Sequence, residues 1–207
     1  MLSQPKKLGS ELLFLSISSG DIHNVINLIE EDEVDVNCPN INGQTPLHFA
    51  VKAQSFKMVE LLLHFKAEPN LKDNYEVGMN TPLHLAAELN LIDILQLLHE
   101  NGGDPTEQNK CGFTCLHIAA RHGYLNMVKY LTLDPGIDKD LRDTYGFNAA
   151  YWAKEYNYLD CLNLLGDPIK ISKEEFTEYM EQVWADAGVD PGKKKGKKKG
   201  KKGKKKK

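Results

Sequence analysis

Three six-residue stretches decide the fold of this chain: Thr45-Pro-Leu-His-Phe-Ala50, Thr81-Pro-Leu-His-Leu-Ala86 and Thr114-Cys-Leu-His-Ile-Ala119. Their threonines lie 36 and 33 residues apart, and a divergent fourth copy, Asn148-Ala-Ala-Tyr-Trp-Ala153, begins 34 residues later. A fixed period of this length is typical of proteins built from stacked supersecondary units. The sequence therefore predicts a repeat architecture.

Each copy also carries the signals of a helix start. Thr45 is a natural N-cap, and Pro46 suits the first helical position, where its missing N–H breaks no hydrogen bond. Apolar residues then recur at the spacing of two short amphipathic helices, at 47–51 and 58–63 in this copy. Two such helices leave one apolar face open, which stacked neighbours cover.

The Thr-Pro-Leu-His-x-Ala string resembles the ankyrin repeat. The resemblance extends over about residues 10–167 and implies an all-α, ankyrin-repeat helical solenoid with short turn tips. We place five repeats, of which the first and last are degenerate, at residues 10–40, 41–73, 74–109, 110–142 and 143–167. Residues 1–9 are expected to be an irregular lead.

The C-terminal residues depart from the repeat pattern. Ser172-Lys-Glu-Glu175 forms a capping box. Apolar residues then recur at helical spacing up to Ala187. We expect an amphipathic helix within residues 168–190, which either caps the stack or binds a partner. Residues 191–207 are expected to be disordered, because like charges at that density cannot collapse into a core.

Charge is distributed unevenly along the chain. Residues 193–207 hold 12 lysines and three glycines, and the remaining 14 basic residues stand against all 29 acidic ones, so residues 1–192 carry a net charge of −15. An acidic body with a basic tail suggests contact with a polyanion. The candidate polyanion-binding residues are Lys193, Lys194, Lys195, Lys197, Lys198, Lys199, Lys201, Lys202, Lys204, Lys205, Lys206 and Lys207.

The lysine tail admits several interpretations. It could bind nucleic acid phosphates, anionic membrane, or acidic protein tails such as those of tubulin, and it could serve as nuclear import signal. It could also be a solubilising segment that partly neutralises the acidic body. No aromatic residues are interleaved with the lysines, so base stacking is not expected.

The sequence shows few signs of a catalytic or metal-binding site. Cys111, Cys115 and His117 are close in sequence, but Cys115 replaces the motif proline, His117 is the motif histidine and no fourth ligand is evident. There is no phosphate-binding glycine loop or nucleophile elbow. We therefore expect no enzyme activity, no cofactor and no metal. Scattered cysteines and the absence of a long apolar segment favour a reducing compartment and exclude a transmembrane helix.

The recurring histidines, His48, His84 and His117, invite a catalytic or metal-binding interpretation. Stacking would place their Cα atoms roughly 10 Å apart, too far for one zinc ion. In ankyrin repeats this histidine hydrogen-bonds the backbone of a turn and so links neighbouring repeats. The resemblance implies the same structural role here.

The resemblance also implies that partners bind on the concave face, which the turn tips and the exposed positions of each first helix form. Aromatic residues and one arginine, types common in interface hot spots, gather there in repeats 3 to 5. The candidate partner-binding residues are Tyr75, Phe113, Arg121, Tyr145, Phe147, Trp152 and Tyr156. The alternative is that Phe113, Phe147 and Trp152 pack repeat against repeat, or under the C-terminal helix.

These observations favour a protein–protein interaction adaptor or scaffold, with the lysine tail as a secondary electrostatic anchor. The alternative is a polyanion-tethering protein, whose tail binds nucleic acid, microtubules or membrane while the repeats carry it. We expect a cytoplasmic protein that is not secreted, with nuclear or cytoskeletal association left open, and a chain that is monomeric on its own.

Overall fold

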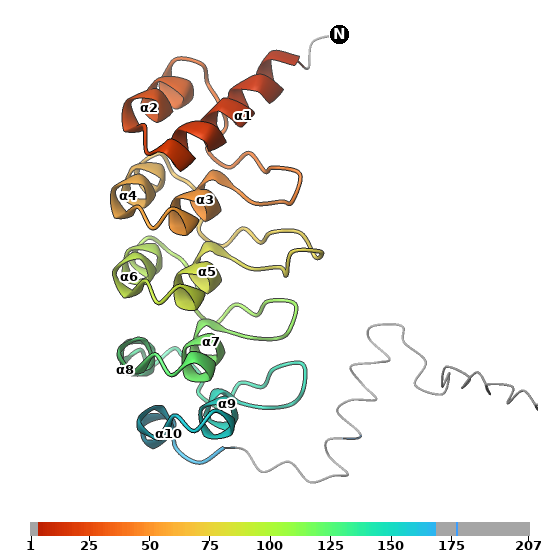
Figure 1. Cartoon of the computed structure of the whole chain (residues 1–207), viewed down its shortest axis with the longest axis vertical. Coiled ribbons are helices and arrows are strands. Elements are labelled where there is room, and N and C mark those ends of the chain that lie inside the picture. The colour runs from red at the N-terminus through yellow and green to blue at the C-terminus, as the bar shows by residue number, and fades with distance from the viewer. Residues whose placement is uncertain (1–3, 169–176, 178–207) are drawn as a thin grey trace, which may run out of the picture. The chain divides into compact units, whose positions relative to one another are not determined.

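A computed structural model describes residues 4–168 and residue 177. Ten α-helices follow one another within residues 4–168, and they belong to the first of two compact units, residues 1–170 (Figure 1). They are α1 (Gln4–Ser19), α2 (Ile22–Glu30), α3 (Pro46–Lys52), α4 (Phe56–His64), α5 (Pro82–Glu88), α6 (Ile92–Glu100), α7 (Cys115–His122), α8 (Leu125–Leu133), α9 (Ala149–Glu155) and α10 (Leu159–Leu165).

The helices form antiparallel pairs that stack into two layers. Odd-numbered helices make one layer, even-numbered helices make the other, and the connecting loops project from the odd-numbered side (Figure 1). Each odd-numbered helix packs against the next one in the row as well as against its own partner. The predicted all-α solenoid is thus confirmed, and residues 4–168 contain no strand.

The core is one continuous apolar layer between the two rows of helices. It runs from Leu13 and Ile17 of α1 to Ala153 of α9 and Cys161 of α10, all of which are buried. The residues at 47–51 and 58–63, predicted as the apolar faces of a helix pair, supply Leu47, Met58 and their buried neighbours. No single pair closes this core, so its stability depends on the neighbours.

The N-terminal segment differs from the prediction. Residues 4–9 were expected to be irregular, yet α1 begins at Gln4 and makes this the longest helix of residues 4–168. A proline in the first turn of a helix breaks no hydrogen bond, so Pro5 does not prevent the helix from starting there.

Each loop before α3, α5, α7 and α9 forms a tight projecting finger, defined here as residues 40–44, 73–80, 109–113 and 143–147. Neighbouring fingers are joined by backbone hydrogen bonds, from the N–H of Asn74 to the carbonyl of Asn42, of Lys110 to Gly78 and of Thr144 to Cys111, at 2.9 to 3.1 Å. Gly43 takes a positive φ of 71° in the first of these turns, a conformation that glycine adopts without strain. The fingers therefore form a continuous, hydrogen-bonded edge.

Two predicted elements lie outside the described residues. These are the amphipathic helix expected within residues 168–190, of which Pro168 and Thr177 alone are described, and the lysine tail at 191–207. Both stay predictions.

Candidate functional site: an aromatic groove on the fingers and inner helices

The motif histidines lie at the joints between repeats. The Nε2 atoms of His48, His84 and His117 lie 2.9, 2.8 and 3.2 Å from the carbonyl oxygens of Asn80, Phe113 and Phe147, each in the finger of the next repeat. All three side chains are buried. Each histidine thus links its own repeat to the next one, which is the structural role that the resemblance implies.

The second ring nitrogen of each histidine fixes its protonation. In repeat 3 the Thr81 backbone N–H donates to Nδ1 of His84 across 3.2 Å, so Nδ1 carries no proton and Nε2 donates to the Phe113 carbonyl. Burial lowers the pKa of His84 from 6.5 to about 4. Burial likewise lowers the pKa of His48 and of His117. These histidines are neutral structural donors and have no lone pair to offer a metal.

Each finger is shaped by one Asn or Asp side chain at its base. The Oδ1 atom of Asn109 accepts the N–H groups of Cys111 and Phe113 at 2.9 and 3.0 Å, and Oδ1 of Asp143 accepts those of Tyr145 and Phe147 at 2.8 and 3.0 Å. Such side chains stabilise tight turns by replacing a backbone acceptor. The sequence analysis missed these residues, although Asn40, Asn109 and Asp143 all stand five positions before a helix cap.

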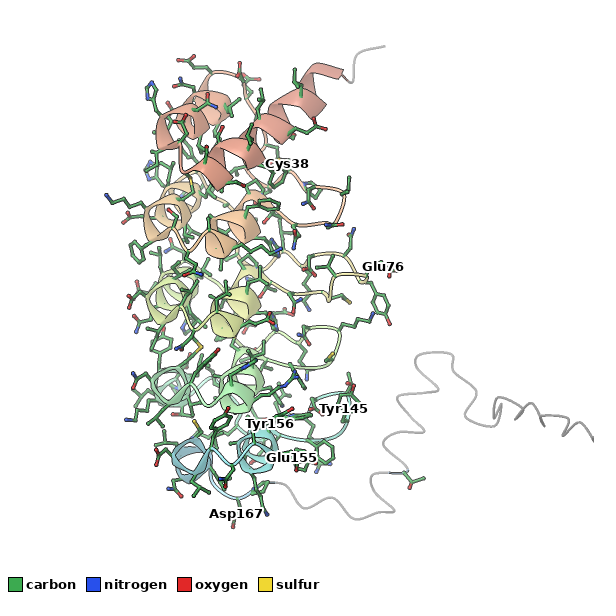
Figure 2. All side chains as sticks on the ribbon, viewed as in Figure 1. Cys38, Glu76, Tyr145, Glu155, Tyr156 and Asp167 are labelled. Atoms are coloured by element: carbon green, nitrogen blue, oxygen red, sulfur yellow. The ribbon has the colours of Figure 1, made fainter. Side chains whose placement is uncertain are left out.

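Six of the seven candidate partner-binding residues line one hollow of about 340 Å³ between the fingers of repeats 4 and 5. We call it the aromatic hollow. Its lining comprises Cys111, Phe113, Arg121, Tyr145, Phe147, Tyr151, Trp152 and Tyr156. In Figure 2, Tyr145 of the finger and Tyr156 at the end of α9 lie at the same end of the stack. Residues separated by more than forty positions in the sequence thus meet at one place.

The rings of the aromatic hollow contact one another. Trp152 meets Phe113 edge-on with centroids 5.3 Å apart, and it stacks at 6.4 Å on Tyr156. The Arg121 guanidinium lies over both Phe113 and Trp152, at 5.7 and 5.9 Å from their centroids. Both distances lie within the range of cation–π attraction. The arginine is therefore held against an aromatic wall.

The candidate partner-binding residues of the hollow differ in how far they are buried. Phe113 is only 6% exposed and stacks on His117, so it backs the hollow and packs between repeats, as the alternative reading of the sequence allowed. Phe147 and Trp152 are half-buried, and the Trp152 Nε1–H donates to Oδ2 of Asp143 at 2.7 Å. Tyr145 and Tyr156 are 45% and 48% exposed. The two tyrosines and Arg121 present the accessible surface.

Tyr151 lines the hollow and was missed by the sequence analysis. It occupies the position, three residues after the helix cap, that holds histidine in repeats 2 to 4. Burial, with the charges of Glu155 and Asp143, raises the pKa of Tyr151, so its hydroxyl stays protonated at neutral pH. The change from histidine to tyrosine at this motif position, in the last repeat, could have pointed to Tyr151 in the sequence.

A second hollow of about 440 Å³ adjoins the first and extends it toward repeat 3. The two share Cys111, Phe113 and Arg121, so together they form one groove, which we call the groove of repeats 3 to 5. Tyr75, the remaining candidate, lines neither of them and lies on the longer finger 73–80. Its ring lies beneath Lys110 Nζ, 3.8 Å from the centroid, at the edge of this groove.

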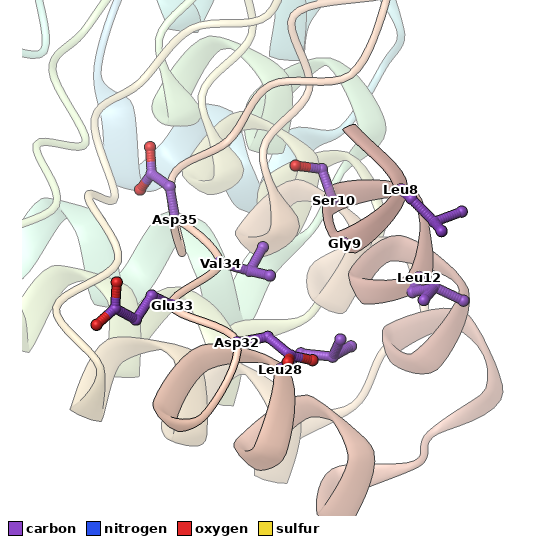
Figure 3. Close-up of a pocket in the computed structure, with 9 residues that line it drawn as sticks. All are labelled: Leu8, Gly9, Ser10, Leu12, Leu28, Asp32, Glu33, Val34 and Asp35. Atoms are coloured by element: carbon purple, nitrogen blue, oxygen red, sulfur yellow. The ribbon is translucent and has the colours of Figure 1, made fainter. Parts of the chain in front are cut away.

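Another hollow, of about 430 Å³, lies at the N-terminal end of the stack and contains none of the candidate residues. Leu8 and Leu12 of α1 line one side, and Asp32, Glu33 and Asp35 of the loop after α2 line another (Figure 3). The leucines are exposed. This hollow differs from the aromatic hollow in having acidic and aliphatic walls.

Cys111, Cys115 and His117, which were considered as zinc ligands, lie in different surroundings. Cys115 is buried, Cys111 is exposed, and both ring nitrogens of His117 are hydrogen-bonded within the chain. Residues 4–168 hold no cluster of three or more His, Cys, Asp or Glu side chains fit for a metal ion. None of the helices in this range has the length and apolarity to cross a bilayer.

Comparison with known families decides the classification. The family model described as ankyrin repeats in three copies matches residues 2–73 and 75–175, which is most of the chain. The chain belongs to the ankyrin-repeat family. The joint histidines and the projecting fingers described above are thus parts of ankyrin repeats.

Several curated relatives share these ankyrin repeats. Human NF-kappa-B inhibitor alpha is 36% identical over 113 residues, 52% of this chain and 35% of that protein. Palmitoyltransferase akr1 of Schizosaccharomyces pombe is 33% identical over 144 residues, 68% of this chain and 22% of that protein. Putative ankyrin repeat protein FPV024 of fowlpox virus is 31% identical over 147 residues, 69% of this chain and 24% of that protein. The chain spans at most 35% of the length of these relatives.

Proposed function

We propose that this ankyrin-repeat chain is a protein–protein interaction adaptor or scaffold that binds a partner protein in the groove of repeats 3 to 5. The observation that carries the proposal is the aromatic hollow, where Arg121, Tyr145, Trp152 and Tyr156 meet on one accessible face. Tyrosine, tryptophan and arginine dominate the binding energy of protein interfaces.

Membership of the ankyrin-repeat family supports protein–protein interaction in general. NF-kappa-B inhibitor alpha, a relative over 52% of this chain, is by its name an inhibitor of another factor. The palmitoyltransferase relative is an enzyme, but this chain covers 22% of its length and matches it through ankyrin repeats, so we propose no transferase activity.

Hydrogen bonds within the chain fix part of the groove, which favours tight binding. Trp152 is fixed by its hydrogen bond to Asp143, and the fingers of repeats 4 and 5 are tied together through Thr144 and Cys111. A partner therefore orders few groups on this side of the interface when it binds, and the entropic cost of association is lower. Phe113, being buried, supports Trp152 from behind.

Affinity capture with a double variant of the exposed tyrosines tests this proposal. Tyr145→Ala with Tyr156→Ala removes two accessible walls of the aromatic hollow and leaves the buried core intact. Because both side chains are about half exposed, we expect unfolding free energy to change by less than about 1 kcal/mol. The matched control, Leu133→Ala with Leu159→Ala, removes exposed apolar side chains from α8 and α10, on the other layer.

The proposal expects partners captured by the wild-type chain and by the leucine control to be lost, or weakened at least roughly tenfold, with the tyrosine variant, since each hot spot carries about 2 kcal/mol. Quantitative mass spectrometry of the captured proteins measures this. Partners retained by the tyrosine variant and lost from the leucine control would contradict it.

We further propose that the 12 lysines of residues 193–207 act as a secondary electrostatic anchor. Their charge supports this, because polyanion binding by lysines weakens steeply with salt. Replacing the lysines of 193–207 by glutamine is expected to weaken partner binding at low salt and to leave it unchanged at high salt. Unchanged binding at low salt would contradict the anchor.

The competing function is polyanion tethering through the tail, with the repeats as carrier. It predicts the opposite pattern: the main interaction persists in the Tyr145 and Tyr156 double variant and disappears with the glutamine tail. The two variants together therefore distinguish the adaptor from the tether, whichever partner is captured.

A further inference from the structure

Among the described residues that line the aromatic hollow, one side chain is charged. Arg121 alone of these eight residues carries a charge at neutral pH. Within the described residues, Lys72 forms a salt bridge with Glu107, and His99 lies 3.4 Å from Asp134. Arg121 is paired with no carboxylate there. The guanidinium is exposed and is positioned by the faces of Phe113 and Trp152.

The other polar groups of the hollow add hydrogen-bond donors. Tyr145, Tyr151 and Tyr156 line it, and their hydroxyls bond to none of the described side chains or backbone groups. The indole N–H of Trp152 is occupied by Asp143 and faces that carboxylate. A ligand in the hollow thus meets one fixed positive charge, phenolic hydroxyls and aromatic faces.

This combination selects the chemistry of the occupant. A carboxylate complements a guanidinium in charge and geometry, because two N–H groups can donate to its two oxygens. Aromatic faces suit an apolar side chain beside it. A cationic side chain would face Arg121 without a compensating acid among the described lining residues. Recognition of phosphate uses clusters of arginines, whereas the described lining holds one.

Building on the adaptor function proposed above, we infer that the aromatic hollow receives an Asp or Glu side chain from an extended segment of the partner protein. The carboxylate pairs with Arg121, and a neighbouring apolar residue of the segment lies against Trp152 and Tyr156. The rest of the segment continues along the groove into the adjoining hollow, where the acids Glu76 and Glu88 join Lys110 in the lining, so the carboxylate is placed at the aromatic hollow and not there.

Selection from a random linear peptide library displayed on phage tests this inference with the full-length chain as bait. Selected peptides are then sorted by whether alkylation of Cys111, which lines both hollows, blocks their binding. Peptides blocked in this way are groove binders. We expect an Asp or Glu at one fixed position in them, next to an apolar residue.

A double-variant cycle then measures the proposed pairing. Arg121→Gln should weaken a selected peptide about tenfold, and replacing its Glu by Gln should weaken it by a similar factor in the wild-type chain but little in the variant. Lys129→Gln, which removes one exposed positive charge from α8, is the control for net charge and should leave affinity unchanged.

The outcomes separate the two proposals. Groove binders without a fixed acid, or with less than about twofold coupling to Arg121, overturn the inference and leave the adaptor function standing. Enrichment of Lys or Arg at the Arg121 position would also overturn it. A selection in which no peptide is blocked by Cys111 alkylation contradicts the groove itself, and with it both proposals.

Discussion

Repeats 3 and 5 are built alike but use two equivalent positions differently. Three residues after the helix cap stands His84 in repeat 3 and Tyr151 in repeat 5, and the next residue is Leu85 in one and Trp152 in the other. His84 and Leu85 are buried at a joint between repeats, whereas Tyr151 and Trp152 are half-buried in the aromatic hollow.

The fingers of repeats 3 and 5 each have an aspartate at the base, and the two aspartates also differ in what they bind. In repeat 5 the second oxygen of Asp143 accepts the Trp152 indole N–H, while the second oxygen of Asp73 in repeat 3 is buried without a hydrogen-bond partner among the described residues. The comparison teaches that repeat 3 uses these positions for stacking, and repeat 5 uses them to shape a surface. Stability and recognition should therefore respond to different substitutions.

The largest expected effect is a loss of unfolding free energy in acid, because the histidines at the joints between repeats are buried in the neutral form. Because burial holds the pKa of His84 at about 4, against 6.5 when it is exposed, the unfolded chain binds the proton first. The stability from neutral His84 is complete above pH 6.5 and is lost as the pH falls toward 4, by about 3 kcal/mol over that window. His48 and His117, whose pKa values are also lowered, add to the loss.

Urea unfolding at a series of pH values measures this loss. His64→Ala, which removes an exposed histidine from α4, is the control for histidine content. An unfolding free energy that stays constant between pH 6.5 and 4 would show that the histidines do not hold the joints as neutral donors.

Matched alanine substitutions at the first equivalent position should separate the repeats. His84→Ala leaves the Thr81 N–H and the Phe113 carbonyl without their buried partner and should cost about 2–3 kcal/mol of unfolding free energy. Tyr151→Ala removes a half-buried ring and should cost about 1 kcal/mol. Chemical denaturation at neutral pH checks both, and equal costs would remove the distinction drawn between the two repeats.

The smallest expected effect of all, at Asp73, is compared with the effect of the same substitution at Asp143. Asp143→Asn replaces the oxygen that accepts the Trp152 indole N–H by an amide group that cannot accept it, and should cost about 1–2 kcal/mol of unfolding free energy. The fluorescence of Trp152, measured in a Trp184→Phe background, should shift. Asp73→Asn keeps the oxygen that accepts the Asn80 N–H and should change stability by less than about 0.5 kcal/mol. A larger loss for Asp73→Asn than for Asp143→Asn would reverse the comparison.

The sequence predicts the fold well, because the period, the Thr-Pro helix starts and the apolar spacing all depend on local rules. The joint histidines followed from the resemblance, and their hydrogen bonds agree with it. The irregular lead was wrong, since helix α1 begins at Gln4 and covers most of it. Pro5 was compatible with either outcome, because the first turn of a helix tolerates proline.

The site was predicted in part. That Arg121, Tyr145 and Tyr156 share one hollow depends on how repeats stack, which the period anticipates. Burial does not follow from the period, so the sequence left open whether Phe113 binds a partner or packs between repeats, and the structure shows it buried. Tyr75 lies outside the aromatic hollow, because its finger belongs to repeat 3 and the hollow lies between repeats 4 and 5. Whether any of these residues contacts a partner stays a prediction.

Cys111 offers the most direct test of the groove, because it lines both hollows and is the exposed one of the four cysteines. Burial raises the pKa of Cys115 to about 12 and also raises the pKa of Cys38 and Cys161, so the other thiols react slowly. The rate of Cys111 alkylation is measured by mass spectrometry in the free chain and in the purified complex with a captured partner. If the partner occupies the groove, we expect at least roughly tenfold slower alkylation in the complex, because the thiol then lies inside a packed interface. An unchanged rate in a saturated complex would contradict the proposed groove.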